Sequence, residues 1–261
     1  MIITSRKNQL ITETRELVGE RKTRTERGEF VIEGQKLVSE AISSGLKLTR
    51  AFVTKSFTEK NQRLCGDIEE KCDVIIISDD VADAISDTKT PQGVFVIAKI
   101  LDKITNSDTI LTYKKIIVLD GLQDAGNVGT IVRTAEAMGI EAIILSGDTA
   151  DIYSPKVVRG AMGSLFRLPC MIENLENVLP KLSADGFDVY AAMLDEKALR
   201  LGSFRFGEKT AVVIGNEGKG ISEKVAACCG KKVYIPIKNA ESLNAAAAAS
   251  ILCWELGKQR L

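Results

Sequence analysis

Short apolar runs alternate with helical spacings along the first hundred residues of the chain. Strands are predicted where apolar residues are consecutive or alternate with polar ones, and helices where they recur every three to four positions. The predicted strands are residues 30–32, 48–53, 74–77 and 93–100, and the predicted helices are residues 8–18, 35–43 and 78–85. Strands that alternate with helices indicate a small α/β unit over residues 1–100.

The remaining chain repeats this alternation with strands that are apolar throughout. Predicted strands are residues 116–119, 142–145, 188–193, 211–214 and 233–235, and predicted helices are 128–138, 155–162, 175–184, 221–229 and 243–256. Continuous apolar strands between helices indicate a mostly parallel sheet with helices on both faces. Residues 101–114 lack a clear period, so they are expected to link the first unit to a second α/β domain, residues 115–261.

The composition is typical of a globular chain with a large core. The 261 residues are 45% hydrophobic and 27% charged. No apolar run approaches the roughly 20 residues of a membrane helix, and the N-terminus lacks a signal-peptide core, so a cytoplasmic location without membrane contact is expected. Six cysteines without a C-x-x-C pair favour reduced, buried thiols over a zinc site, and no metal is expected.

Two further features of the composition limit the chemistry. The chain has no histidine, which excludes Ser-His-Asp and Cys-His hydrolysis and any histidine general base. Its 35 basic and 35 acidic residues give no overall charge that favours nucleic acid, although a local patch would suffice. Four cations within residues 21–27 form one candidate patch, for which a solvated loop is the simpler interpretation.

Three polar loops each follow a buried strand of the second domain. They span residues 120–133, 215–220 and 234–244. Ligands of parallel sheets bind beyond the carboxyl ends of the strands, so a ligand site is expected there. In the first loop, Asn127 and Arg133 are six residues apart and fall on opposite sides of an ideal helix, so Asn127 is expected to act from the cap position.

Each loop has a simpler explanation when it is taken singly. The glycine-rich loop 215–220 matches neither G-x-G-x-x-G nor a P-loop, and a tight turn explains such glycines more often than a cofactor does. Ser242 or Asn244 could cap the alanine-rich helix that follows, and a capped, buried helix needs no ligand. The coincidence of three loops in one domain favours a binding site, but composition and periodicity do not decide its ligand.

The residues of these loops resemble the three motifs of SpoU (TrmH-type) RNA 2′-O-ribose methyltransferases. The motifs are Asn127-x-Gly129-x-Ile131-x-Arg133, then Gly215-Asn216-Glu217-Gly218-x-Gly220, then Ile235-Pro236-Ile237 followed by Ser242-Leu243-Asn244. Residues 30–34 and 90–93 also resemble the substrate-binding domain that often precedes this catalytic domain. The resemblance therefore covers the chain almost end to end.

The resemblance implies a knotted α/β catalytic domain of the SPOUT type that binds S-adenosylmethionine. A first domain with a ribosomal-protein-like α/β RNA-binding fold is implied as well. The implied cofactor contacts are Gly215, Asn216, Gly218, Ile235 and Leu243, and the implied catalytic set is Arg133, Asn127, Glu217, Ser242 and Asn244. Arg133 would be essential as base, as stabiliser of a developing alkoxide or as phosphate ligand, and Asn127 would orient Arg133 or the RNA.

The resemblance also bears on partners and on the substrate. Family members are homodimers, and the alanine-rich helix with Trp254 would suit a protomer contact as well as an intrachain core. The first domain would contact RNA phosphates through Arg6, Lys7, Arg21, Lys22, Arg24 and Arg27. The expected reaction is 2′-O-methylation of ribosomal RNA. Methylation of transfer RNA and a non-catalytic RNA-binding protein are the alternatives, and a nucleotide-cofactor oxidoreductase is disfavoured because G-x-G-x-x-G is missing.

Overall fold

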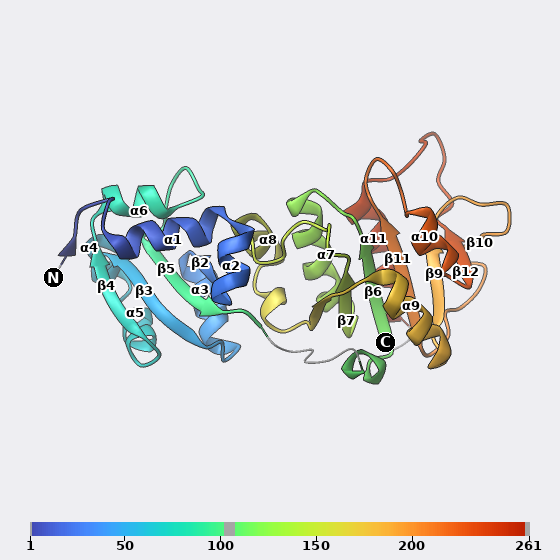
Figure 1. Ribbon diagram of the computed structural model, residues 1–261, viewed down its shortest axis with the longest axis horizontal. Coiled ribbons are helices and arrows are strands. Elements are labelled where there is room, and N and C mark those ends of the chain that lie inside the picture. Colours follow the sequence, from blue (N-terminus) through green and yellow to red (C-terminus); the bar gives the residue numbers. More distant parts are fainter. Residues whose placement is uncertain (1, 102–107, 259–261) are drawn as a thin grey trace. The chain divides into compact units, whose positions relative to one another are not determined.

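The computed structural model describes residues 2–101 and 108–258, which form two compact units (Figure 1). The first unit contains residues 1–101 and 151–166, and the second contains residues 102–150 and 167–261. Residues 102–107 of the predicted linker lie outside the described residues, and a short 3-10 helix, Thr109–Thr112, follows them. Among the described helices, none is both long and apolar enough to cross a membrane.

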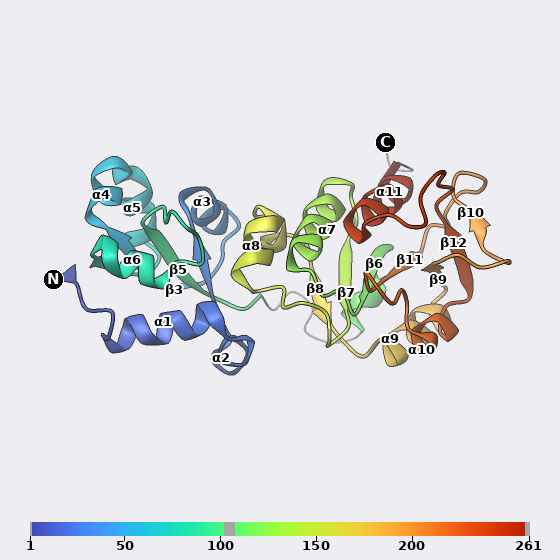
Figure 2. The same cartoon turned by 90° about the horizontal axis from the view of Figure 1, so that it is seen from above.

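A five-stranded mixed sheet forms the centre of the first unit. Its strands are β1 (Ile2–Ile3), β2 (Glu29–Glu33), β3 (Leu48–Thr54), β4 (Asp73–Ile77) and β5 (Val94–Lys99), in the order β1-β4-β3-β5-β2. Its helices are α1 (Gln9–Gly19), α2 (Arg21–Arg27), α3 (Gln35–Ser43), α4 (Lys55–Lys60), α5 (Gln62–Glu69) and α6 (Asp79–Ile85). Figure 2 shows α3, α4 and α5 on the side of the sheet opposite to α1. The seven predicted elements are confirmed within about two residues.

Three helices of this unit are not predicted by periodicity. The segment that forms α2 contains no apolar residue, so no helical spacing marks it. The segments of α4 and α5 are six and eight residues long, and each buries at most two side chains. Short helices with so few core residues carry too little pattern to be recognised from sequence.

Residues 151–166 pack with the first unit although the sequence places them inside the second domain. They contain α8 (Pro155–Ala161) and a 3-10 turn, Ser164–Phe166. The ring of Phe30 in β2 lies 4.9 Å from the ring of Tyr153 and 6.4 Å from that of Phe166. The division by contacts therefore differs from a continuous domain over residues 115–261, because this packing joins residues far apart in the chain.

Arg24 of α2 has a structural role and not the phosphate contact expected from the sequence. Its side chain is only 4% exposed, and its Nε donates to Oδ2 of Asp151 at 2.7 Å. Its Nη1 donates to the backbone carbonyls of Leu17 and Val18 at 2.6 and 2.9 Å. Because every face of the guanidinium is engaged inside the unit, Arg24 is removed from the predicted RNA contacts.

We expect Arg24→Met to lower the free energy of unfolding by about 3–5 kcal/mol, because it leaves Asp151 largely buried without its cation. The measurement is chemical denaturation of the variant and the wild type. The control is Lys22→Met on the same helix, where the side chain is 82% exposed and a change within about 0.5 kcal/mol is expected. A loss below about 1 kcal/mol for Arg24→Met would show that the buried pair does not hold residues 151–166 to the unit.

The second unit is built on a parallel sheet, as predicted. Its seven strands pair in the order β10-β12-β9-β11-β6-β7-β8, and all the pairings are parallel. The strands are β6 (Lys115–Asp120), β7 (Ala142–Leu145), β8 (Cys170–Ile172), β9 (Asp188–Ala192), β10 (Leu199–Arg200), β11 (Thr210–Gly215) and β12 (Lys231–Tyr234). The short strands β8 and β10 lie at the sheet edges and were not predicted, since neither is a buried apolar run.

Helices cover both faces of this sheet. They are α7 (Ala125–Ala137), α9 (Leu175–Ala184), α10 (Glu223–Ala227) and α11 (Ala245–Gly257). Figure 2 shows α7 and α11 on one face and α9 and α10 on the other. The helix pair α7–α11 packs closely, because a Cβ atom at Gly257 would lie 2.0 Å from the carbonyl oxygen of Met138. The small residues of α11 therefore serve intrachain packing, which brings the loops before α7 and α11 together.

Candidate active site

The glycine-rich loop after β11 is fastened to the loop after β6 by the carboxylate of Glu217. Its Oε1 accepts hydrogen bonds from Nδ2 of Asn127 at 2.9 Å and from the backbone N–H of Asp124 at 3.2 Å. Its Oε2 accepts from the backbone N–H of Gln123 at 3.2 Å. One side chain thus joins the first and second motifs of the sequence.

The third motif joins this cluster through Asn244. Its Nδ2 donates to Oδ1 of Asn127 at 3.1 Å. Its own Oδ1 accepts from the backbone N–H groups of Ala246 and Ala247, at 2.9 and 3.2 Å, and so caps α11. Of the two cap candidates in the sequence, the structure selects Asn244. Three of the five predicted catalytic residues therefore form one hydrogen-bonded chain, Glu217–Asn127–Asn244.

Asn127 does not occupy the helix cap that the sequence led us to expect. Asp124 is the N-cap of α7, and its Oδ1 accepts from the backbone N–H of Asn127 at 2.9 Å. The helix begins three residues before the predicted residue 128, since an aspartate in extended conformation is a strong cap. Asn127 consequently presents its side chain from the first turn of the helix.

The charge of Glu217 determines how the amide of Asn127 points. Burial raises the pKa of Glu217, but hydrogen bonds from Asn127 and from backbone N–H groups outweigh burial and leave the pKa below its ordinary value. The group is therefore a carboxylate at neutral pH, and a carboxylate only accepts hydrogen bonds. Asn127 must turn its NH2 group to Glu217, which leaves its carbonyl oxygen to accept from Asn244.

Asn216 and Gly215 shape the glycine-rich loop from within. Nδ2 of Asn216 donates to the carbonyl of Gly121 at 2.7 Å, and its Oδ1 accepts from the backbone N–H of Gly218 at 3.0 Å. A Cβ atom at Gly215 would lie 2.2 Å from backbone atoms of Gly220. Both residues allow the chain to fold tightly on itself, and neither lines the adjoining cavity.

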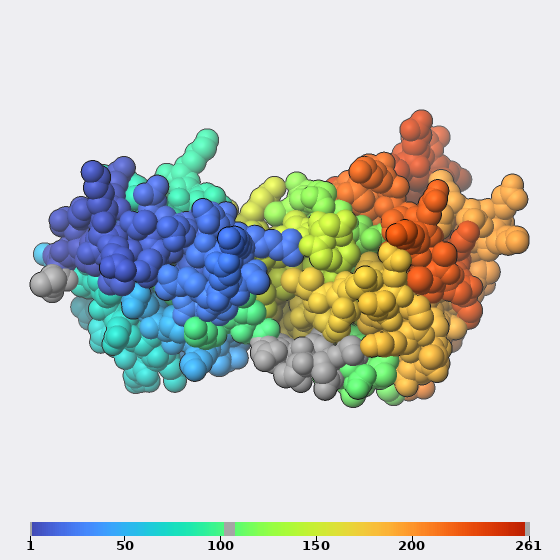
Figure 3. All heavy atoms as spheres, viewed as in Figure 1, coloured from blue at the N-terminus to red at the C-terminus, as the bar shows by residue number. Residues whose placement is uncertain are grey.

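A mostly apolar cavity of about 300 Å³ opens at the carboxyl ends of β9 and β12. Ile235 and Leu243 line it as predicted for cofactor contacts, together with Ser242, whereas Gly215, Asn216 and Gly218 do not. The loop that joins β12 to α11, in red-orange, lies at the surface (Figure 3). Ligand pockets span about 300–1,000 Å³, so the cavity is large enough for the apolar part of a nucleoside.

Several residues that line the cavity were not anticipated from the sequence. Met193 and Leu194 follow β9, and Ile237 and Glu241 lie in the loop after β12. Leu194 is 71% exposed and contributes an apolar side chain to the cavity. Residues 188–193 were predicted as a strand of the same sheet, so the rule that ligands bind at strand carboxyl ends could have included Met193 and Leu194.

Arg133 stands apart from the hydrogen-bonded chain. It is exposed on α7, and its side chain makes no hydrogen bond or ion pair with any residue that the structure describes. It follows Asn127 by six residues, roughly 9 Å along the helix axis. The amide of Asn127 is engaged by Glu217 and Asn244, so Asn127 does not orient Arg133 within one chain.

The cysteines form neither disulfides nor a metal site among the described residues. All six cysteines are unpaired, and burial raises the pKa of Cys253 to about 12. Cys65 and Cys253 are buried as expected, whereas the other four cysteines are only half-buried. Within residues 2–101 and 108–258, no group of three or more cysteine or acidic side chains could hold a metal ion.

A parallel sheet whose carboxyl-end loops enclose an apolar cavity beside a polar cluster defines an α/β cofactor-binding domain. Comparison with protein families identifies the family within this class. The SpoU rRNA Methylase family matches residues 114–254, and the MRM3-like substrate binding domain matches residues 8–96. The chain belongs to the SpoU rRNA methylase family.

Individual relatives are similar to this chain in sequence or structure over nearly its whole length. The 23S rRNA (guanosine(2553)-2′-O)-methyltransferase RlmP of Bacillus subtilis is 33% identical over 97% of this chain and 98% of its own length. An AdoMet-bound rRNA methyltransferase from Sinorhizobium meliloti has a TM-score of 0.88 at 29% identity and covers all of this chain, with 98% of its own. The methyltransferase AviRb of Streptomyces viridochromogenes, solved with AdoMet, has a TM-score of 0.85 at 27% identity over 97% of this chain and 98% of its own. The resemblance drawn from the motifs is confirmed.

Proposed function

We propose that this protein transfers a methyl group from S-adenosylmethionine to a ribose 2′-hydroxyl of ribosomal RNA in the cytoplasm. The observation that carries the proposal is the chain Glu217–Asn127–Asn244, which unites three separate loops beside the apolar cavity. The relatives support it, because the Bacillus subtilis protein is named a 23S rRNA 2′-O-methyltransferase and two structural relatives were solved with AdoMet.

The cavity residues suit the cofactor by their chemistry. S-adenosylmethionine supplies a methyl group on a positively charged sulfur, which makes the methyl group electrophilic. Ile235 and Leu243 would pack against the adenosine, and the Ser242 hydroxyl and the Glu241 carboxylate would bind its polar atoms. Gly215, Asn216 and Gly218 contribute indirectly, because they let the backbone fold closely enough to form the edge of the site.

The polar cluster would position the substrate ribose. Fixed alignment of reacting groups can lower a barrier by up to about 7–11 kcal/mol. The bonds from Asn127 to Glu217 and Asn244 hold its side chain rigidly, so its second N–H is available to orient RNA. Arg133 carries a fixed positive charge and is a poor base, so we assign it to the developing alkoxide or to an adjacent phosphate.

We propose further that the enzyme is a homodimer in which Arg133 of one protomer acts at the site of the other. Within one chain, Arg133 makes no hydrogen bond or ion pair with the described residues of the cluster. Helix α11, which packs against α7, exposes Ile251 by 37% and Trp254 by 50%. Large apolar side chains on such a face would be buried by a second protomer, which would also bring a second Arg133 close.

We also propose that the C-terminal part of the second unit is knotted. The chain leaves β12, which lies two strands from β11, and returns as α11 against β11 and β6. The close approach of Gly215 to Gly220 tightens the loop through which the chain would pass. We assign residues 1–100, the predicted substrate-binding domain, to selection of the RNA, and residues 115–261 to catalysis.

The test is transfer of a labelled methyl group from S-adenosylmethionine to 23S rRNA and to transfer RNA, both transcribed in vitro without modifications. We expect label in 23S rRNA. Label only in transfer RNA would move the activity to that substrate. Failure to bind S-adenosylmethionine in calorimetry would favour a non-catalytic RNA-binding protein, and NAD(P)H binding in its place would favour an oxidoreductase.

A further inference from the structure

A polar groove in the first unit has no part in the chemistry described above. It consists of two cavities, one of about 510 Å³ bordered by α3, α4, α6 and the loop before β5, and one of about 730 Å³ bordered by α3 and α5. The two cavities share lining residues Gln35, Lys60, Asn61 and Gln92. They therefore adjoin each other, and we call them together the α3–α5 groove. Both volumes lie in the range of ligand pockets.

Three cations of the α3–α5 groove have no acidic partner among the residues that the structure describes. Lys36, Lys60 and Arg63 are exposed, and their side chains make no hydrogen bond or ion pair with the residues that the structure describes. By contrast, Arg6 and Arg27 of the patch predicted from sequence are paired with carboxylates of the same unit. An unpaired cation gives up no ion pair when it binds a phosphate, so the groove is the better phosphate site.

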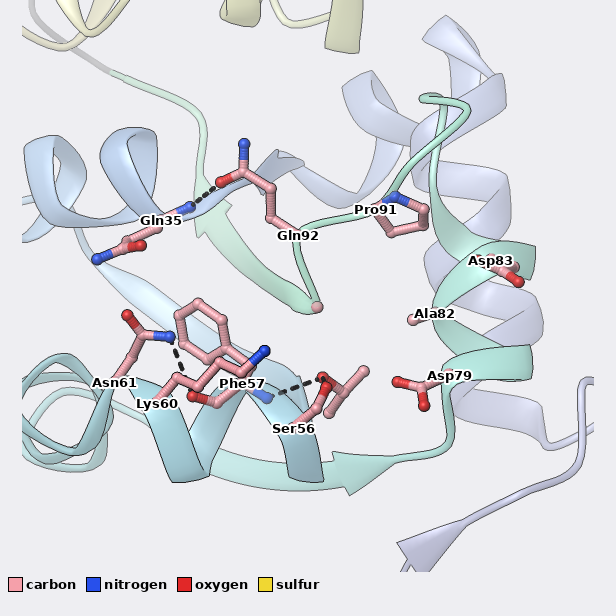
Figure 4. A pocket seen from close by; sticks show the side chains of 12 residues that line it. Gln35, Ser56, Phe57, Lys60, Asn61, Asp79, Ala82, Asp83, Pro91 and Gln92 are labelled. Carbon is pink, nitrogen blue, oxygen red and sulfur yellow. Dashed lines mark hydrogen bonds between the residues drawn. The ribbon is translucent and has the colours of Figure 1, made fainter.

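The charge changes sign along the groove. The larger cavity is lined by Lys36, Lys60 and Arg63 and also by the carboxylates of Glu40 and Asp67, so its cations outnumber its carboxylates by one. The smaller cavity is lined by Lys60, Asp79 and Asp83, so its carboxylates outnumber its cation by one. Figure 4 shows these two aspartates on α6, across the smaller cavity from Gln35 on α3 and from Asn61, which lies between α4 and α5. The excess of positive charge favours phosphates in the larger cavity, and Asp79 and Asp83 disfavour them in the smaller one. Carboxylates in the smaller cavity can instead accept hydrogen bonds from the amino groups of a nucleobase.

The walls of the smaller cavity are fixed before any ligand arrives. Oε1 of Gln92 accepts from the backbone N–H of Gln35 at 2.9 Å and ties the loop before β5 to α3. Nδ2 of Asn61 donates to the carbonyl of Phe57 at 3.1 Å. The loop can approach this closely because of Gly93, where φ is +77° and a Cβ atom would lie 2.4 Å from Oγ1 of Thr54. A preformed groove loses little conformational entropy on binding.

We propose that the α3–α5 groove binds a single-stranded segment of the ribosomal RNA substrate. The phosphates lie against Lys36, Lys60 and Arg63, and a base enters the smaller cavity toward Asp79 and Asp83. A single strand is required because the base edges of an RNA duplex are largely inaccessible to side chains. The inference rests on the proposed function and names the surface of residues 1–101 that selects its RNA.

The test compares two triple variants with the same change in charge. The groove variant is Lys36→Ala, Lys60→Ala, Arg63→Ala, and the control variant is Arg15→Ala, Lys47→Ala, Lys71→Ala. The control side chains are also exposed and without partners among the described residues, but they line neither cavity. Binding of unmodified 23S rRNA is measured over a range of salt concentrations, together with kcat and KM for methyl transfer and the thermal unfolding midpoint.

We expect the groove variant to bind 23S rRNA at least about tenfold more weakly than the control variant. Its salt dependence should be shallower by about 2 in the slope of log K against log salt, since each contact with a single strand contributes about 0.7. KM for RNA should rise, whereas kcat and the affinity for S-adenosylmethionine should stay close to wild type. Lys60→Ala alone, which removes the cation shared by both cavities, supplies the same comparison if the triple variant unfolds.

Equal binding by the groove and control variants would overturn the groove assignment, and methyl transfer by the wild type would leave the proposed function intact. If the wild type binds 23S rRNA without transferring a methyl group, the proposed function fails. In that case, weaker binding of 23S rRNA by the groove variant than by the control variant would still support the α3–α5 groove as an RNA-binding site. A wild type that binds no 23S rRNA would overturn both.

Discussion

Arg133→Ala is expected to lower kcat/KM for methyl transfer by at least about 100-fold while S-adenosylmethionine binds with unchanged affinity. The reason is that Arg133 is exposed on α7 and does not line the cavity proposed for the cofactor, so its charge is available to the reacting nucleotide. Removing one group that stabilises developing negative charge costs about 100- to 1,000-fold in rate. Single-turnover methyl transfer and calorimetry with S-adenosylmethionine measure the two effects separately.

Thr130→Ala is the matched control for Arg133→Ala, because Thr130 is an exposed residue of α7 whose hydroxyl donates only to the carbonyl of Gly126. The control should retain wild-type transfer. If Arg133→Ala also abolishes cofactor binding or lowers the unfolding midpoint, Arg133 has a structural role and the catalytic assignment is wrong.

The placement of Arg133 in a dimer has its own test by subunit mixing. An Arg133→Ala protomer keeps Glu217, and a Glu217→Ala protomer keeps Arg133. If Arg133 acts at the partner's site, a mixed dimer contains one complete site and regains activity that neither parent dimer has. Inactive mixed dimers would contradict action across the interface.

Gly215→Ala is expected to abolish detectable binding of S-adenosylmethionine. The added Cβ atom would lie 2.2 Å from the Gly220 carbonyl carbon and from the backbone nitrogen of Ile221. Backbone atoms cannot move aside as the end of a flexible side chain can, so the glycine-rich loop must shift. Ile221 lines the cavity proposed for the cofactor, so the shift would change that cavity. Isothermal calorimetry with S-adenosylmethionine measures the effect.

Gly218→Ala in the same loop is the control for Gly215→Ala. Its added Cβ atom would meet nothing closer than Oδ1 of Asn216 at 3.8 Å, which is ordinary contact. We expect cofactor affinity within about threefold of wild type, corresponding to less than about 0.7 kcal/mol. Equal losses in the two variants would show that any side chain in the loop is harmful, and not the specific backbone contact at Gly215.

The sequence predicted the second unit well because its strands carry a strong signal. Every residue of β6 and β7 is buried, and residues 116–119 and 142–145 of these strands are uninterrupted apolar runs. Parallel strands also place their carboxyl ends at one edge of a sheet, which is why polar loops far apart in sequence could be assigned to one site. The Glu217–Asn127–Asn244 chain follows from that placement together with the family motifs.

The errors have a common physical cause, which is that partners distant in sequence decide the role of a residue. Arg24 looked like a surface cation within a charge run, and only the fold places Asp151 beside it. Asn127 looked like a helix cap until Asp124 took that position. The free cations of the α3–α5 groove could not be separated from paired ones in the sequence, because pairing is a property of the folded chain.

The proposed transfer to a ribose 2′-hydroxyl is tested most directly by the position of the methyl group in the product. Labelled 23S rRNA from the reaction with wild-type protein is digested, and the labelled product is identified as a 2′-O-methyl nucleotide or a methylated base. We predict that the label lies on a ribose 2′-oxygen, where it also makes the adjacent phosphodiester bond resistant to alkali. Label on a base would contradict 2′-O-methylation of the ribose.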